Sequence, residues 1–205
     1  MRKAKDGTIA LLFVDASHFV MGCDYLGYYY GVVRRLVRTF SGRKRYNVLG
    51  ALDFISKKMT TIANETYITS IEICELISKI AMEYSGIPVF LVLDNARYQK
   101  CKIVTELAAQ LNVSLVYIPP YSPNLNLIER LWKHVKSKLR VKYYDNFDEF
   151  MAKIDAIIES TDKSNKVAID KLIGEKVQFF HDDDFDNVVN MPSMNPIAKL
   201  YNKVA

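Results

Sequence analysis

Three acidic residues stand at the ends of elements that the sequence predicts. Asp15 ends the apolar run TIALLFV, Asp94 ends the run VFLVL, and Glu129 opens a helix after a turn. Such positions place side chains at the edge of a sheet, where active sites collect. Three carboxylates repel one another unless they share a cation, and hard divalent ions with oxygen ligands meet that need. Two Mg²⁺ or Mn²⁺ ions about 3.5–4 Å apart can activate a water or a 3′-hydroxyl and stabilise the leaving oxygen.

Each acid also has a purely structural interpretation, and spacing alone leaves the choice open. Asp15 and Asp94 are also the kind of residue that strand-terminal turns use. Glu129 is also the reciprocal member of an Asn126-x-x-Glu129 capping box. His18, three residues after Asp15, is near enough in sequence to approach the metals, but we do not count it among their ligands.

Basic residues gather in two stretches of the chain. Residues 31–45 hold six basic residues and no acid, and residues 129–142 hold six with one carboxylate. In the predicted helix, Glu129 and three of these cations fall at i, i+4, i+7 and i+11, so they share one face. A solvated surface explains a single run equally well, whereas two runs favour polyanion binding. The residues that we predict to contact the phosphates of such a polyanion are Arg43, Lys44, Arg45, Lys133, Lys136 and Arg140.

Hydrophobic periodicity predicts the elements that position these residues. Thr69-x-x-Glu72 indicates a capped helix that ends before Gly86 and Pro88. Strands are predicted at 8–14, 46–55, 59–63, 89–93 and 113–118, with a hairpin between the second and third. Further helices are predicted near 98–111, 126–141 and 147–160. The first has Ile103, Val104, Leu107, Ala108 and Leu111 on one face, and the second has a buried stripe of Ile128, Leu131, Trp132, Val135 and Leu139. The alternation after residue 89 implies parallel strands joined by helices, and therefore an α/β domain.

Length and composition bound the class of protein. The chain has 205 residues, of which 50% are hydrophobic and 25% charged, with a net charge of +5, which suits one sizeable domain. We expect a domain over residues 1–175, with an insertion or clamp-like segment at 16–45, and a loosely structured tail at 176–205. No apolar run approaches the roughly 18 residues of a membrane span, and the basic start lacks a signal-peptide cleavage pattern. Three scattered cysteines suggest neither disulfides nor zinc, so we expect a reducing compartment.

Three sequence blocks resemble the catalytic motifs of DDE transposases in the mariner-like superfamily, notably its bacterial insertion-sequence branch. They are LLFVDASHF, LVLDNARYQK and PPYSPNLNLIERLWKHVKSKL, and the resemblance covers roughly residues 8–160. It implies a ribonuclease-H-like fold, with a mixed five-stranded sheet flanked by helices. It also implies that Asp15, Asp94 and Glu129 are the catalytic triad and bind two Mg²⁺ or Mn²⁺ ions. Asn95 and Asn126 match asparagines beside the second and third acids, and we expect them to support the site.

The same resemblance implies a function and its partners. The expected activity is cleavage and strand transfer of a mobile element, at TA targets, by a homodimer or larger synaptic complex on double-stranded DNA. Family members carry N-terminal helix-turn-helix modules, whereas this chain reaches its first catalytic strand within about ten residues. We therefore consider a separate helix-turn-helix polypeptide as the source of end recognition. For a bacterial source, the expected location is the cytoplasm, associated with the nucleoid.

Several positions depart from the family pattern. Leu127 replaces a frequent Pro, Ala16 a frequent Glu, and residues 97–99 lack a frequent His. None of these changes removes an acid of the triad. Two alternative functions stay open, namely a related metal-dependent nuclease or integrase and a non-catalytic, transposase-derived DNA-binding protein.

Overall fold

The computed structural model describes residues 2–21, 44–119, 125–139 and 144–174. Its strands are β1 (Ala10–Val20), β2 (Arg45–Asp53), β3 (Met59–Asn64), β4 (Val89–Leu93) and β5 (Val113–Tyr117). Its helices are α1 (Arg2–Lys5), α2 (Ser70–Glu83), the 3₁₀ turn η1 (Arg97–Gln99), α3 (Lys102–Gln110), α4 (Ile128–Leu139), α5 (Phe147–Glu159) and α6 (Lys166–Gly174). Within these ranges, no helix is both long enough and apolar enough to cross a membrane.

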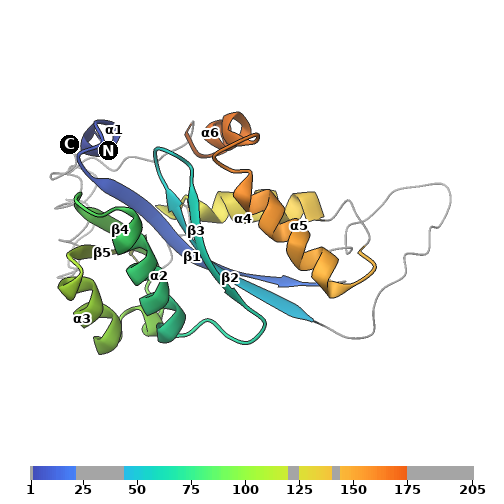
Figure 1. Ribbon diagram of the computed structural model, residues 1–205, viewed down its shortest axis with the longest axis horizontal. Coiled ribbons are helices and arrows are strands. Elements are labelled where there is room, and N and C mark those ends of the chain that lie inside the picture. The colour runs from blue at the N-terminus through green and yellow to red at the C-terminus, as the bar shows by residue number, and fades with distance from the viewer. Residues whose placement is uncertain (1, 22–43, 120–124, 140–143, 175–205) are drawn as a thin grey trace.

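The strands form one mixed sheet in the order β3-β2-β1-β4-β5, through the middle of the molecule (Figure 1). The hairpin β2–β3 is antiparallel, as predicted, and Asp53 stabilises its turn by accepting hydrogen bonds from the backbone N–H groups of Ile55 and Ser56, at 2.8 and 2.7 Å. β2 is antiparallel to β1, whereas β4 is parallel to both β1 and β5. The helical crossovers α2 and α3 make the parallel pairs possible. The predicted mixed five-stranded sheet is therefore confirmed.

Helices cover both faces of the sheet. Successive side chains of each strand point to opposite faces, so each face presents apolar side chains to a helix layer. On one face, alternate residues of β1 such as Leu12 and Val14 pack with α2 and α3. On the other face, Phe13 and Phe19 pack with α4, α5 and α6. Figure 1 shows α2 and α3 side by side near β4 and β5, apart from α4 and α5. Asp15 has the same parity as Phe13 and Phe19, so it belongs to the α4 face.

Two predicted helices differ in how well their buried faces were identified. The buried stripe of α4 is as predicted and consists of Ile128, Leu131, Trp132, Val135 and Leu139. The apolar face of α3 is buried only in part, since Ile103 is 57% exposed and only Val104 and Ala108 are fully buried. The reason is that α3 is short and contacts the core through a single i, i+4 row. The capping box of α2 is confirmed, since Thr69 and Glu72 exchange hydrogen bonds at its first turn.

Asp15 does not end its strand, which corrects the first strand prediction. β1 continues to Val20 because β2 extends the antiparallel register as far as Arg45. Pairing with β4 stops earlier, at Phe13 opposite Val92. From Val14 onward, β1 therefore keeps a strand neighbour on one edge only. Residues 16–20 of the predicted insertion belong to β1, whereas residues 22–43 and the predicted tail lie outside the described residues.

Gly50 allows α4 to approach the sheet beside Asp15. It lies opposite Asp15 in the β1–β2 register, on the face that α4 covers. A Cβ atom at this position would lie 2.9 Å from two ring carbons of Trp132 and 2.5 Å from the methyl group of Met59. The methionine can move, but the buried indole cannot move without shifting α4. The missing side chain of Gly50 is therefore what lets the ring of Trp132 approach β2 closely.

We predict that Gly50→Ala lowers the free energy of unfolding by about 1–3 kcal/mol, the usual cost of overpacking a core. The loss would occur although alanine suits an extended backbone better than glycine does. Urea denaturation followed by circular dichroism measures the change. Ser114→Ala, at an exposed position of β5, should change the value by less than about 0.5 kcal/mol. A Gly50→Ala protein as stable as the wild type would show that the indole is loosely packed.

Candidate active site

Asp15 and Glu129 line one pocket of about 280 Å³, beside the part of β1 that β4 leaves unpaired. Asp15 comes from the middle of β1 and Glu129 from the first turn of α4. Helical spacing places Trp132, Lys133 and Lys136 on the same side of α4 as Glu129, and all of them line the pocket. The remaining lining residues are Ala16, Ser17 and His18. The helix face that the sequence predicted thus meets the strand of the first acid.

Asp94 directly follows β4, the parallel neighbour of β1. One of its carboxylate oxygens accepts a hydrogen bond of 3.0 Å from the backbone N–H of Ala96, which begins the turn into η1. The negative charge of Asp94 raises the pKa of both Asp15 and Glu129. Such coupling requires the three acids to lie in one region of the molecule. Within the described ranges, however, no three acidic, histidine or cysteine side chains are close enough together to hold a metal ion.

The carboxylate of Asp15 lies in an unfavourable environment for a negative charge. Burial, as the main cause, raises its pKa to about 7, and the charges of Asp94 and Glu129 act in the same direction. The backbone N–H of Ala16 and the indole of Trp132 oppose this shift. Burial also raises the pKa of Glu129, against the nearby charge of Lys133. The site therefore gathers acidic groups whose charged forms are disfavoured by burial and mutual repulsion, and a cation would be stabilised there.

Asn126 connects the helix of the third acid to the strand of the first. Its side-chain amide donates a buried hydrogen bond of 3.0 Å to the backbone carbonyl of Val14. The other side-chain atom, Oδ1, is buried and has no partner among the described residues, so it does not cap Glu129. The structure therefore excludes the capping-box interpretation of Asn126 and Glu129, which the spacing alone had left open. The physical reason is that β4 no longer pairs with Val14, whose carbonyl needs another donor.

Asn95 has a similar bridging role at the second acid. Its side-chain amide donates a hydrogen bond to the backbone carbonyl of Ile118, just beyond β5. This contact joins the ends of β4 and β5 next to Asp94. Both predicted supporting residues thus hold together elements that carry acids. That role depends on which strand ends are adjacent, so the sequence alone did not show it.

Part of the predicted DNA-contact set lies away from the acids, whereas His18 lines the pocket but has its Nδ1 beside Asn47. His18 projects from the other face of β1, where its Nδ1 lies 2.6 Å from Oδ1 of Asn47. Lys44 lies over the ring of Phe147, at 5.3 Å from its centroid, and Arg45 pairs with Val20 at the far end of β1. Arg43 and Arg140 lie outside the described residues. Of the six predicted basic residues, Lys133 and Lys136 are thus the two that the structure places in the pocket with Asp15 and Glu129.

Tyr98 and Trp132 are residues near the acids that we did not single out from the sequence. Burial and the charges of Asp94 and Asp15 raise the pKa of the Tyr98 phenol, which places this side chain near both acids. Trp132 appeared in the sequence only as a member of the buried stripe of α4. Its position three residues after Glu129 was the available signal, because residues at that spacing share a helix face.

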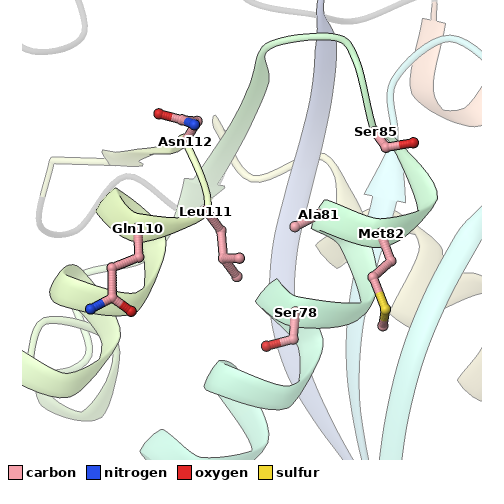
Figure 2. A pocket seen from close by; sticks show the side chains of 7 residues that line it. All are labelled: Ser78, Ala81, Met82, Ser85, Gln110, Leu111 and Asn112. Atoms are coloured by element: carbon pink, nitrogen blue, oxygen red, sulfur yellow. The ribbon is translucent and has the colours of Figure 1, made fainter.

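A second, larger hollow of about 570 Å³ lies between the ends of α2 and α3, on the face of the sheet opposite Asp15. Figure 2 shows its lining side chains, which are Ser78, Ala81, Met82, Ser85, Gln110, Leu111 and Asn112. None of them is acidic, basic, histidine or cysteine. We therefore assign no chemistry to this hollow.

The raised pKa of Asp15 predicts a specific pH dependence of stability. Between the unfolded pKa of 3.8 and the folded value of about 7, the native state holds a proton that the unfolded state has lost. The stability of the wild type therefore falls as pH rises through this window, by at most about 1.4 kcal/mol per pH unit. Asp15→Asn removes this loss, so between pH 5 and pH 8 its free energy of unfolding should rise relative to the wild type by about 1–3 kcal/mol.

Urea denaturation in EDTA at the two pH values tests this. Asp6→Asn, at an exposed position, serves as the control and should show the same pH dependence as the wild type. If the free energies of unfolding of Asp15→Asn and the wild type differed by the same amount at both pH values, the raised pKa of Asp15 would be contradicted.

Known structures share this fold. A chain of the pre-cleavage Mos1 transpososome matches with a TM-score of 0.56 and 13% identity, over 88% of this chain and 59% of that one. The Mos1 transposase catalytic domain, solved with Raltegravir and Mn, matches with a TM-score of 0.54 and 11% identity, over 85% of each chain. A chain of the simian T-cell lymphotropic virus intasome, in complex with PP2A regulatory subunit B56 gamma, matches with a TM-score of 0.55 and 17% identity, over 76% of this chain and 49% of that one.

These matches confirm the ribonuclease-H-like fold of transposases and integrases. The chain spans about half the length of the matched intasome chain and 59% of that in the Mos1 transpososome. No curated protein sequence is significantly similar to it. Residues 10–151 match the family described as DDE superfamily endonuclease, a range that contains all three acids. The chain therefore belongs to the DDE superfamily of endonucleases.

Proposed function

We propose that this chain is the catalytic domain of a transposase that cleaves DNA and joins the cut strand to a target. The observation that carries this proposal is the pocket in which Asp15 and Glu129 face the cations Lys133 and Lys136. Acids at the centre suit the reacting phosphate and its metals, whereas lysines at the margin suit the flanking phosphates. Membership of the DDE superfamily of endonucleases supports the same reaction class.

The residues present suit divalent metal ions in their chemistry. Asp15, Asp94 and Glu129 offer only oxygen donors, which Mg²⁺ and Mn²⁺ prefer. A bound cation would neutralise the negative charge that these three acids bring together. The Mos1 catalytic domain, with the same fold, has been solved with Mn. When bound, two such ions would supply an activated water or 3′-hydroxyl and stabilise the leaving oxygen.

The surrounding residues have roles that this chemistry needs. Lys133 and Lys136 hold the phosphate backbone by charge, without reading the base sequence. Asn126 and Asn95 fix the backbones that carry the acids. No serine, cysteine or tyrosine stands in a sequence setting typical of a protein nucleophile. Water and the DNA 3′-hydroxyl are therefore the attacking groups.

The proposal extends to the assembly in which the domain works. Mos1 transposase is known from a pre-cleavage transpososome, in which the protein acts as part of a DNA complex. We propose that this chain likewise binds two element ends and a target in a homodimer or larger synaptic complex, with insertion at TA dinucleotides. Helix-turn-helix modules, on a separate polypeptide or the same one, would recognise the ends. The mobile element would be a bacterial insertion sequence, and the protein would act in the cytoplasm at the nucleoid.

The first test of this proposal is metal-dependent DNA cleavage. We predict that the protein nicks supercoiled plasmid in Mn²⁺, and that EDTA stops the reaction. Asp94→Asn should reduce nicking at least 100-fold while preserving the fold and DNA binding, because it keeps the shape of the side chain but removes its charge. Agarose gels measure nicking, circular dichroism checks the fold, and Asp6→Asn is the matched control that should stay active.

The other outcomes of this assay separate the alternatives. Nicking without joining of a 3′-hydroxyl oligonucleotide to the plasmid would favour a nuclease, and sequenced junctions away from TA would exclude the proposed target. DNA binding without nicking would favour a non-catalytic DNA-binding protein. Nicking that persists in EDTA, or a covalent protein–DNA adduct that survives denaturant, would refute the metal mechanism.

A second test concerns Lys133 and Lys136. If each neutralises one phosphate, replacing both with Ala should flatten the slope of log affinity against log salt by about two units. Binding should weaken about equally for unrelated DNA sequences. Fluorescence anisotropy over a range of salt concentrations measures the slope. The control replaces Lys79 and Lys102, on the helices of the opposite face, with Ala and should leave the slope unchanged. An unchanged slope after replacement of Lys133 and Lys136 would show that these two lysines are only solvated surface residues.

A further inference from the structure

Trp132 is fixed in place by contacts on several sides. Its ring lies against Gly50, which has no side chain and stands opposite Asp15 in the register of β1 and β2. The ring of Phe19 meets it edge-on, with centroids 6.0 Å apart and an interplanar angle of 77°. Phe19 in turn carries the ammonium group of Lys136 over its face, at 5.6 Å. Only 4% of Trp132 is exposed, so these contacts leave the indole little freedom.

The indole N–H of Trp132 has no hydrogen-bond partner among the described residues, although it is buried. Such groups are rare in folded proteins, and each one calls for an explanation. The candidate acceptor is the carboxylate of Asp15, which lines the same pocket and whose pKa the indole N–H lowers, as a nearby hydrogen-bond donor does. The two groups are therefore close enough to influence one another, but they do not meet in hydrogen-bond geometry.

The three carboxylates interact, yet within the described ranges no three side chains are arranged to hold an ion. An ion that bound Asp15 would reorient its carboxylate, whereas the indole is held by packing and cannot follow. A rigid donor beside a movable carboxylate selects one orientation of that carboxylate.

We propose that Trp132 is a positioning residue, whose indole N–H completes a hydrogen bond to Asp15 when a divalent ion binds, and so orients this carboxylate as a ligand. The inference rests on the proposed function, because it requires Asp15 to bind the ion. It adds to that function a residue outside the triad, held in register by Gly50 and Phe19.

The protein contains one tryptophan, so a nitrogen-15 correlation spectrum shows a single indole N–H signal. We expect Mg²⁺, which is diamagnetic, to move this signal downfield and to slow its exchange with solvent, as a new hydrogen bond would. In Asp15→Asn the same Mg²⁺ concentration should leave the signal in place. An indole signal that stays fixed while Mg²⁺ demonstrably binds would overturn the proposal.

Variants provide the second measurement. Trp132→Phe keeps an aromatic ring against Gly50 but removes the N–H, and it should weaken Mn²⁺ binding about 10-fold, within the range known for residues that orient metal ligands. The electron paramagnetic resonance signal of free Mn²⁺ measures the affinity. Val135→Ala, buried on the same helix one turn further on, is the matched control, which should lower stability and leave the affinity within twofold. A Trp132→Phe affinity within twofold of the wild type would also overturn the proposal.

The two levels of inference fail in different ways. If the wild type binds no Mn²⁺, or Asp15→Asn binds it equally well, the proposed metal site is wrong and the role of Trp132 falls with it. If Asp15→Asn abolishes binding but neither the indole signal nor Trp132→Phe responds as expected, the metal site stands and only the role of Trp132 is refuted.

Discussion

The hydrogen bond from Asn126 to the carbonyl of Val14 joins the two halves of the active site. It exists because β4 stops pairing with β1 at Phe13, which leaves the next carbonyl on that edge without a strand partner. A buried carbonyl requires a donor, and the segment before α4 supplies one. This requirement fixes the start of α4 beside Asp15, and so brings Glu129 into the same pocket. The open edge of β1 thus creates both the pocket and the attachment of the helix that lines it.

The electrostatics of the site lower the stability of the fold. Burial of Asp15 next to two further acids disfavours its charged form, and Lys133 is the nearby cation that opposes the accumulated charge at Glu129. The rest of the domain compensates through two apolar cores, one on each face of the sheet. Functional sites commonly reduce stability in this way, because groups arranged for an absent ligand are not arranged for one another. A substrate or ion that neutralises the charge would also stabilise the fold.

The fold alone does not choose among the reactions of this superfamily, since transposases and retroviral intasome proteins share it at similar levels of structural likeness. What is particular to this chain is the set of contacts around its acids. Gly50 admits Trp132, Phe19 orients both Trp132 and Lys136, and Asn126 fixes the helix start. A common sheet is thereby adapted by side chains from β1, β2 and α4, whereas the hollow between α2 and α3 carries no comparable groups.

The sequence by itself determined most of the elements and predicted the three acids of the candidate site. Apolar runs, the capping box of α2 and the stripe of α4 are local patterns, and their periodicity reports burial directly. The sequence could not show that Asp15 lies inside a strand, because the length of β1 depends on its antiparallel partner β2. The sequence also left open whether Asn126 forms a capping box, which its i, i+3 spacing to Glu129 allows, because the unpaired carbonyl of Val14 that takes its side chain is distant in sequence. Only the tertiary structure decided which donors and acceptors meet, because partners such as Gly50 and Trp132 are distant in sequence and satisfy packing and hydrogen bonding that no local pattern records.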